Sequence, residues 1–383
     1  MMIKKLRHYH LKKQNLLQKA ETGEYPEILK NHIGLHSTDY ITPYISLWAR
    51  VQDFDPGNLF DDINNRNAVR MRAFRGTVFV IHRDNLKMIL GGSRHFLKRV
   101  MTDNINFGRK QGADLEKLEQ QIISLITENG PLTAGEIKKK FDNKPDDMHF
   151  MIAMRILDMG GTLVRSSQRY ITDKVIIYEL MTRWIHDADF DNLNSDTALE
   201  DLIFQYINKF GPVCLEDICW WLPLTKTFAK KFLERLENKL IRLSINDTEY
   251  IMEKEDYNRF ENFTYSDRNT VINFLPYEDH FPKAYNIRDW FLSEEISPRV
   301  LSVGMYKTDY GQLRPTIWLN GEIIGRWEIQ WKDKDKSEAE VEIVDINKKN
   351  VTSGKVDGLI ETRKKELKDF INEKLVAVMK KRT

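Results

Sequence analysis

Residues 67–81 read Asn67-Ala-Val-Arg70-Met-Arg72-Ala-Phe-Arg75-Gly-Thr77-Val-Phe-Val-Ile. Charged and apolar side chains alternate along the first half of this stretch. Because successive side chains of a strand point to opposite faces, we expect a half-buried strand with Val69, Met71 and Ala73 turned inward. Arg70 and Arg72 then project together from the other face, and two neighbouring guanidinium groups suit phosphate.

Two later segments repeat one order of elements, and each is anchored on a Gly-Pro pair. Gly130-Pro131 ends an apolar-periodic helix over 118–128, and Gly211-Pro212 ends one over 199–209. A short amphipathic helix, a longer helix and a hairpin follow each pair. Three helices closed by a hairpin are typical of a winged helix-turn-helix module. The hairpins are predicted at 163–165 with 169–171, and at 240–242 with 250–252.

Residues 1–112 fit a third, more divergent copy, in which residues 69–81 form the wing. Internal repetition on this scale favours tandem modules that share a continuous surface. We therefore predict an α+β fold of tandem winged helix-turn-helix modules, followed by a β-rich C-terminal region and a terminal helix. The predicted boundaries are 1–112, 113–178 and 196–255 for the modules, 264–331 for the β-rich region, and 332–383 for a charged tail with the terminal helix.

The C-terminal third has its own signals. Asn320-Gly321 lies between two apolar runs, which predicts a tight β-hairpin. Between residues 361 and 379, Leu367, Ile371, Leu375 and Val378 recur at helical spacing. This stripe favours a terminal helix docked on the rest of the molecule.

Positive charge is concentrated near the N-terminus, although the whole chain is nearly neutral, with 59 Lys and Arg against 57 Asp and Glu. Residues 63–110 contain eleven basic residues and two acids, and residues 1–20 contain six basic residues and no acid. Such asymmetry is typical of a face that binds nucleic acid or a membrane surface, with an ordinary solvated surface as the alternative.

Membrane insertion and metal binding find no support in the sequence. The chain lacks a run of 18 apolar residues, and its N-terminus becomes polar too early for a signal peptide. Cys214 and Cys219 have no partner pair at zinc spacing, so we expect reduced core residues. The histidines are scattered without ligand spacing, and we predict no metal and no cofactor.

Residues 6–331 resemble the winged-helix DNA glycosylases of the AlkZ and YcaQ type, and the resemblance rests on five ordered motifs. The motifs are Gly34-Leu35-His36-Ser37-Thr38, Tyr44-Ile-Ser-Leu47-Trp48-Ala-Arg50, Met71-Arg72-Ala-Phe-Arg75-Gly76-Thr77, Leu275-Pro276-Tyr-Glu-Asp279, and residues 314–327 from Arg314-Pro315 to Arg-Trp327. The resemblance implies removal of alkylated bases from DNA, unhooking of interstrand crosslinks, and no cofactor.

The resemblance also points to the catalytic positions. In the family a Gln-x-Gln or Gln-x-Asp pattern places or activates the hydrolytic water, and those positions fall here on His36 and Thr38, which do not match it. A neutral His36 could accept a proton from water or orient it, because its ordinary pKa lies near 6.5. Thr38 could help hold that water, and Asp39 could stabilise positive charge. The alternative is structural: a hydrogen-bonded His36, with Thr38 or Asp39 capping the next helix.

Phosphate contacts are assigned to the cationic segment. We predict that DNA is bound by Arg70, Arg72, Arg75, Arg83, Lys87, Arg94, Lys98 and Arg99. Arg75, just before Gly76-Thr77, has the alternative role of tying two elements together. Aromatic residues such as Trp220 and Trp221 are either core residues or stacking platforms for bases.

The sequence thus predicts a monofunctional DNA glycosylase that hydrolyses the N-glycosidic bond of alkylated purines. Its partner is double-stranded DNA that is alkylated or crosslinked, with no membrane involved, and the oligomeric state stays open. We expect a cytoplasmic protein that is associated with the nucleoid when it binds DNA. The alternatives are a non-catalytic winged-helix DNA-binding or regulatory protein, and a protein-interaction scaffold.

Overall fold

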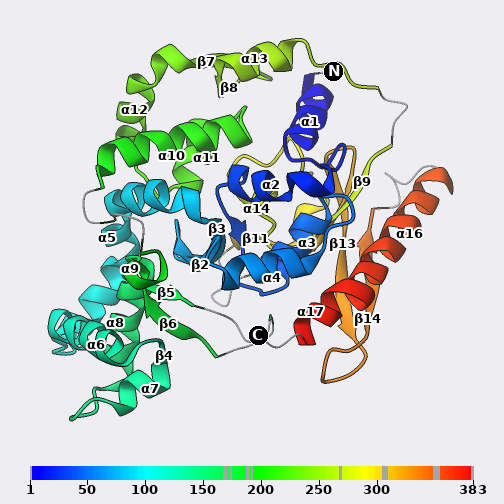
Figure 1. The fold of residues 1–383 in the computed structure, drawn as a ribbon. Coiled ribbons are helices and arrows are strands. Elements are labelled where there is room, and N and C mark those ends of the chain that lie inside the picture. The colour runs from blue at the N-terminus through cyan, green and yellow to red at the C-terminus, as the bar shows by residue number, and fades with distance from the viewer. Residues whose placement is uncertain are drawn as a thin grey trace.

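A computed structural model describes residues 2–166, 171, 175–186, 190, 193–266, 270–303, 309–347 and 354–380. The chain begins with four helices, α1 (Met2–Lys13), α2 (Tyr25–Asn31), α3 (Thr42–Trp48) and α4 (Pro56–Asn64). The hairpin β2 (Ala68–Ala73) and β3 (Thr77–His82) follows, as predicted, with Val69, Met71 and Ala73 buried and Arg70 and Arg72 half-buried. A short strand, β1 (Leu35–His36), pairs with β3. Helices α2, α3 and α4 and the hairpin lie near the centre of the molecule, with α1 above them in the view (Figure 1).

The long helix α5 (Leu86–Lys110) lies along α10 (Ser195–Phe210) (Figure 1). Two glycines permit the close approach. A Cβ on Gly91 would lie 2.6 Å from the Cβ of Ala198, and a Cβ on Gly92 would lie 3.2 Å from the Ala198 carbonyl oxygen. The packing therefore connects the cationic N-terminal segment to elements that lie a hundred residues later.

We call residues 115–184 the α6–α9 unit. It contains α6 (Leu115–Asn129), β4 (Leu132–Thr133), α7 (Ala134–Lys139), α8 (Asp147–Met159), β5 (Leu163–Arg165), β6 (Ile177–Leu180) and α9 (Met181–Trp184). The predicted helices are confirmed. The second strand was wrongly placed at 169–171: Arg169 and Tyr170 lie outside the described residues, Ile171 is in a turn, and β6 pairs with β5 instead.

We call residues 195–261 the α10–α13 unit. After α10 it contains α11 (Leu215–Trp221), α12 (Lys226–Arg235), β7 (Leu240–Ile245), β8 (Thr248–Glu253) and α13 (Lys254–Glu261). The side chains of Asn194 and Thr225 cap α10 and α12 by accepting hydrogen bonds from backbone N–H groups. The predicted hairpin is confirmed as β7 and β8.

The C-terminal region forms a four-stranded sheet in the order β14-β13-β12-β9. Asn320 and Gly321 join β12 to β13 with φ values of 50° and 82°, which confirms the predicted tight turn. The terminal helix is also confirmed as docked, because Leu367, Ile371 and Leu375 are buried. The elements are β9 (Ile272–Leu275), α14 (His280–Lys283), α15 (Ser297–Val300), β10 (Leu301–Val303), β11 (Asp309–Leu313), β12 (Thr316–Leu319), β13 (Glu322–Trp331), β14 (Ala339–Ile346), α16 (Gly354–Asp369), a π-helical segment (Phe370–Leu375) and α17 (Val376–Lys380).

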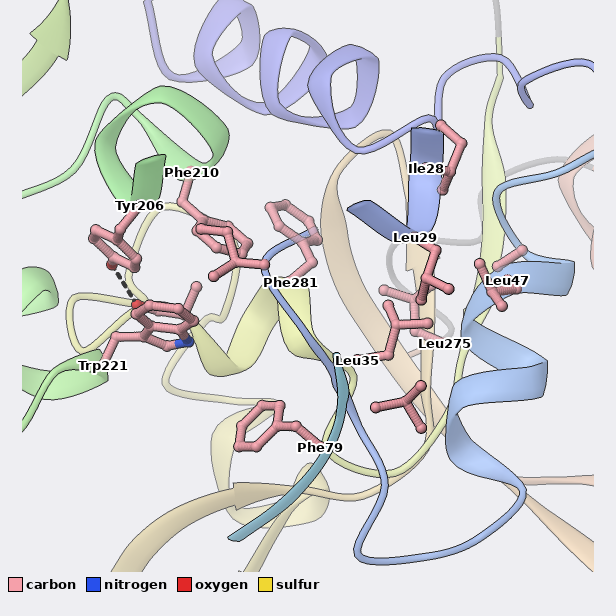
Figure 2. Close-up of a cluster of buried hydrophobic side chains, with 14 of the residues drawn as sticks. Ile28, Leu29, Leu35, Leu47, Phe79, Tyr206, Phe210, Trp221, Leu275 and Phe281 are labelled. Carbon is pink, nitrogen blue, oxygen red and sulfur yellow. Dashed lines mark hydrogen bonds between the residues drawn. The ribbon is translucent and has the colours of Figure 1, made fainter. Parts of the chain in front are cut away.

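One hydrophobic core, which we call the main core, joins the N-terminal region, the α10–α13 unit and the C-terminal region. Figure 2 shows part of it, including Leu35 and Phe79 of the N-terminal region, Tyr206 and Trp221 of the α10–α13 unit, and Phe281 of the C-terminal region. The α6–α9 unit has a second core around Ile122, Phe150 and Leu157. Its β5 strand serves both, because Leu163 belongs to the second core and the next residue, Val164, to the main core.

The two parts are also joined by a sheet. Its strand order is β1-β3-β2-β5-β6-β4, and the junction between β2 and β5 is the register pair Arg70 and Arg165. The sheet therefore continues from the N-terminal hairpin into the α6–α9 unit. In the part of the chain that the structure describes, no helix is long and apolar enough to cross a membrane.

Candidate functional site

The loop from Gly34 to Asp39 carries the candidate catalytic residues, and it is held against the edge of strand β3. His36 is in register with Phe79, and the Ser37 N–H donates to the Val78 carbonyl over 2.7 Å. The backbone of this loop is therefore fixed by sheet pairing rather than left to move. That rigidity suits groups that must be positioned accurately.

His36 is buried, with an exposed fraction of 2%. Its ring packs edge to face against Phe79 and Tyr277, at centroid distances of 5.5 and 6.4 Å. Burial, and next the positive charge of Lys283, hold the pKa of His36 well below its ordinary value, and Asp279 only partly opposes this shift. The imidazole is therefore neutral at physiological pH, as predicted for a base. However, it does not itself reach solvent, so any action on water passes through a neighbour.

Thr38 is that neighbour. Its side chain is exposed, and its Oγ1 lies 3.1 Å from His36 Nε2 and accepts a hydrogen bond from the Val78 N–H over 3.4 Å. The His36 Nδ1 finds no partner among the described residues. If Nδ1 carries the ring proton, Nε2 accepts a hydrogen bond from the Thr38 hydroxyl. The Thr38 oxygen can then accept a hydrogen bond from water.

Asp39 stands next to Thr38 and is half-buried. Its Oδ1 accepts a hydrogen bond from the Ile41 N–H over 3.1 Å, which forms a local turn before α3. The second carboxylate oxygen has no hydrogen-bond partner among the residues that the structure describes. Thr38 and Asp39 are thus the groups through which the loop meets solvent.

The predicted phosphate ligands Arg70 and Arg72 have internal partners. Arg70 donates from Nε to Ser37 Oγ over 3.1 Å and from Nη2 to the Ser37 carbonyl over 3.0 Å. Burial, together with the charge of Arg165, lowers the pKa of Arg70 to about 10. Arg72 pairs with Asp158 of α8 over 3.1 Å, and Arg165 pairs with the same carboxylate over 2.9 Å. These arginines buttress the loop and the sheet, and a contact with DNA stays a prediction.

The remaining predicted DNA ligands lie at different places. Arg75 is exposed, and its guanidinium carbon lies 3.9 Å from the centroid of the Trp220 ring. Arg94 donates to the carbonyls of Phe190 and Leu193. Lys87 and Arg99 are exposed and Arg83 is half-buried, whereas the Lys98 side chain lies outside the described part of the structure. The structure brings Arg75 next to the candidate site and spreads the others along α5 and the turn before it.

A pocket of about 160 Å³ opens beside the loop. Strand β3 contributes Thr77 and Phe79 to its wall, so the pocket adjoins the residue, Val78, whose N–H bonds to Thr38. Most of the charged residues that line this pocket were not predicted from the sequence as site residues. The aromatic residues of the lining are Phe74, Phe79, Trp220 and Trp221, and the charged ones are Arg75, Glu278, Lys283 and Arg288.

A buried ion pair places the segment around Glu278 next to the loop. Arg50 Nη2 and Asp279 Oδ1 are 2.7 Å apart, both side chains are fully buried, and the Ser46 hydroxyl also donates to Asp279. The Thr42 hydroxyl donates to the Tyr277 carbonyl. Two of the quoted motifs, 44–50 and 275–279, are therefore joined by one network. Glu278 belongs to the motif at 275–279, to which the sequence analysis assigned no function. That unassigned motif was the signal that could have identified Glu278.

No metal centre is evident in the described part of the chain, where no group of three or more His, Cys, Asp or Glu side chains converges. Cys214 is buried and Cys219 half-buried, and both are free thiols.

Comparison with known proteins places this geometry in a family. Residues 29–345 match the family model described as DNA glycosylase AlkZ-like. Among solved structures, Streptomyces sahachiroi DNA glycosylase AlkZ superposes with a TM-score of 0.71 at 15% identity, over 88% of this chain and 89% of that chain. At this identity the superposition shows a shared fold, and no curated protein sequence gave a significant match. Because the family model spans most of the sequence, the chain belongs to the AlkZ-like DNA glycosylase family.

Proposed function

We propose that this glycosylase hydrolyses the N-glycosidic bond of alkylated purines in double-stranded DNA, including purines held in crosslinks. One observation carries the proposal. Thr38, whose side chain is exposed, is hydrogen-bonded to the buried, neutral imidazole of His36 on a loop that is fixed to the sheet. These are the positions that the family resemblance assigns to the water-placing pair.

The chemistry makes modest demands on such a site. A purine alkylated at N7 or N3 carries positive charge and is a good leaving group, so the sugar develops oxocarbenium character and needs a placed water. The Thr38 oxygen would accept a hydrogen bond from that water while His36 holds the hydroxyl in position. The free oxygen of Asp39 would stabilise the positive sugar. General-base assistance of this kind is typically worth about 10²- to 10⁴-fold in rate.

DNA binding would extend along both sides of the site. We propose that the α6–α9 and α10–α13 units act as winged helices and contact the DNA backbone, together with the exposed cations of α5 and Arg75. If six phosphates are neutralised, the logarithm of the binding constant should fall with the logarithm of salt concentration at a slope of about −5.

Release of N7-methylguanine from a duplex is the direct test. Abasic sites are revealed with alkali, and an unmodified duplex of the same sequence is the background control. Wild-type protein should release the base, whereas His36→Ala should lose at least about 100-fold in single-turnover rate. His36→Gln, which places the family's residue there, should retain more activity. A duplex with an N7–N7 guanine crosslink tests unhooking.

Two controls keep this result interpretable. The thermal midpoint of each variant excludes simple unfolding, and the dissociation constant for the same duplex excludes a loss of binding. Tight binding without release from any alkylated duplex would contradict the proposal, and would identify a lesion-binding protein without chemistry instead.

A further inference from the structure

The pocket beside the loop has a rigid aromatic floor. Phe74 and Phe79 meet edge to face at 4.9 Å, and Phe74 lies 4.1 Å from Trp221, measured between ring centroids. Figure 2 shows Phe79 and Trp221 within the buried cluster, so the floor is continuous with the main core. Trp220 forms a wall, and its Nε1 donates to the Lys283 carbonyl over 3.1 Å. Flat apolar surfaces of this kind suit a sugar or a base.

The charges above this floor do not cancel. The buried Glu278 is already committed, because its carboxylate accepts from Lys283 Nζ and from the Leu313 N–H. Arg75 has no hydrogen-bond or ion-pair partner among the described residues. Its guanidinium lies over the Trp220 ring, and its N–H donors remain available to a ligand. Arg288 lies over the same indole at 5.7 Å and anchors its Nε on the Tyr285 carbonyl.

Two acids, Asp289 and Glu294, line a second groove that shares Trp220 and Arg288 with the pocket. These two carboxylates can reduce the positive potential that Arg288 adds to the pocket, but the positive charge of Arg75 within the pocket is left uncompensated. A cationic N7-alkylpurine would be repelled from this pocket, whereas a phosphate would be attracted to it.

We propose that this pocket binds a phosphate-bearing nucleotide next to the lesion, not the alkylated base. The phosphate would lie on Arg75, with Arg288 nearby, and the sugar or base would lie over Phe79 and Trp220. The proposal rests on the proposed function, since damaged DNA supplies the nucleotide. It assigns Arg75 and Trp220 a positioning role for the strand that passes Thr38.

Calorimetric titration with small probes tests the pocket without requiring catalysis. The probes are 2′-deoxyadenosine 5′-monophosphate, deoxyadenosine and inorganic phosphate. The monophosphate should bind at least about 10-fold more tightly than deoxyadenosine, because its charge-assisted hydrogen bonds are the strong ones. It should also bind more tightly than phosphate alone, because of the aromatic floor. Arg75→Ala should remove the first difference, and Trp220→Leu should reduce both.

Arg363 supplies a matched control. It also lies over a tryptophan ring, that of Trp48 at 6.0 Å, but it is paired with Glu366 on α16, on the side of the molecule away from the α6–α9 unit (Figure 1). Arg363→Ala should therefore titrate like wild type. Equal binding of monophosphate and deoxyadenosine, or an Arg75→Ala protein that behaves like wild type, would overturn the proposal. Equal binding of monophosphate and phosphate would overturn the role of the aromatic floor.

Salt dependence on duplex DNA gives an independent readout. With a duplex that contains a stable abasic-site analogue, Arg75→Ala should make the slope less negative by about 0.9, the value for one phosphate contact. Arg363→Ala should leave the slope unchanged, and an unchanged slope in Arg75→Ala would also overturn the proposal. Because neither experiment measures base release, a protein that fails to release N7-methylguanine can still pass both tests.

Discussion

The α6–α9 and α10–α13 units share one order of helices and hairpin, yet they are built into the molecule differently. The first has its own core and joins the rest through the β2–β5 junction, the Arg72–Asp158 ion pair and a few residues, such as Val164, that belong to the main core. The second has no separate core, because residues such as Tyr206, Phe210 and Trp221 belong to the main core. The α10–α13 unit also contributes Trp220 to the wall of the pocket. Similar sequence patterns therefore become an attached unit or part of the site according to what they pack against.

Acid should produce the largest difference in stability between the main body and the α6–α9 unit. His10, His32, His36 and His280 belong to the buried main body, and burial holds the pKa of each well below 6.5. The unfolded chain takes up protons first as pH falls through 6.5, so the folded state loses stability below that pH and regains it above. One pH unit lower, at pH 5.5, each histidine contributes about 1.4 kcal/mol, so the loss amounts to at most about 5.5 kcal/mol.

Urea unfolding at pH 7.5 and 5.5, combined with hydrogen exchange, checks this expectation. Exchange should accelerate in the main core before it does in the α6–α9 unit. An unchanged unfolding free energy between the two pH values would contradict the assignment of neutral, buried imidazoles.

The buried ion pairs should separate the two regions next. Asp279→Ala leaves Arg50 fully buried without its partner, and should cost about 3 to 5 kcal/mol in unfolding free energy. Asp158→Ala breaks the ion pair with Arg72 that ties the α6–α9 unit to β2, and also the pair with Arg165 inside the unit. Its cost should be smaller, about 1 to 3 kcal/mol, because the Arg72 side chain is 29% exposed and can turn toward water. Equal losses of unfolding free energy in the two variants would mean that the contact between the α6–α9 unit and β2 is as buried and as costly to break as the ion pair in the main core.

The two classes of arginine on one hairpin give a smaller effect. Arg70→Leu removes two hydrogen bonds to Ser37 and should slow base release about 10-fold, because the loop loses its buttress. The salt slope for DNA binding should stay at the wild-type value. In Arg75→Ala the order is reversed, with a changed salt slope and a smaller effect on the rate at saturating protein. A changed slope in Arg70→Leu would show that its guanidinium also reaches phosphate.

Local pattern carried much of the fold. Alternation identified the buried face of β2, and Asn320-Gly321 identified a tight turn, because both depend on residues adjacent in the sequence. The partners of Arg70 and Arg72 could not be found in this way. Ser37 and Asp158 lie 33 and 86 positions away, and only the folded sheet and α8 bring them within reach.

The candidate site shows the same limit. The motif positions indicated His36 and Thr38, but the burial of His36 depends on Phe79 and on Tyr277, from a distant part of the chain. Trp220 was ambiguous, because helical spacing cannot distinguish a core residue from a pocket wall. Its exposure follows from how α11 docks, which places Trp221 inward and Trp220 against Arg75.

In the proposed mechanism the Thr38 hydroxyl, held by His36, places the hydrolytic water. Single-turnover release of N7-methylguanine by wild type, Thr38→Ser and Thr38→Val at saturating protein examines this role, with the DNA dissociation constant as a control. Thr38→Ser should stay within a few-fold of wild type, whereas the nearly isosteric Thr38→Val should lose at least about 100-fold at unchanged affinity. Release by Thr38→Val at the wild-type rate would contradict the claim.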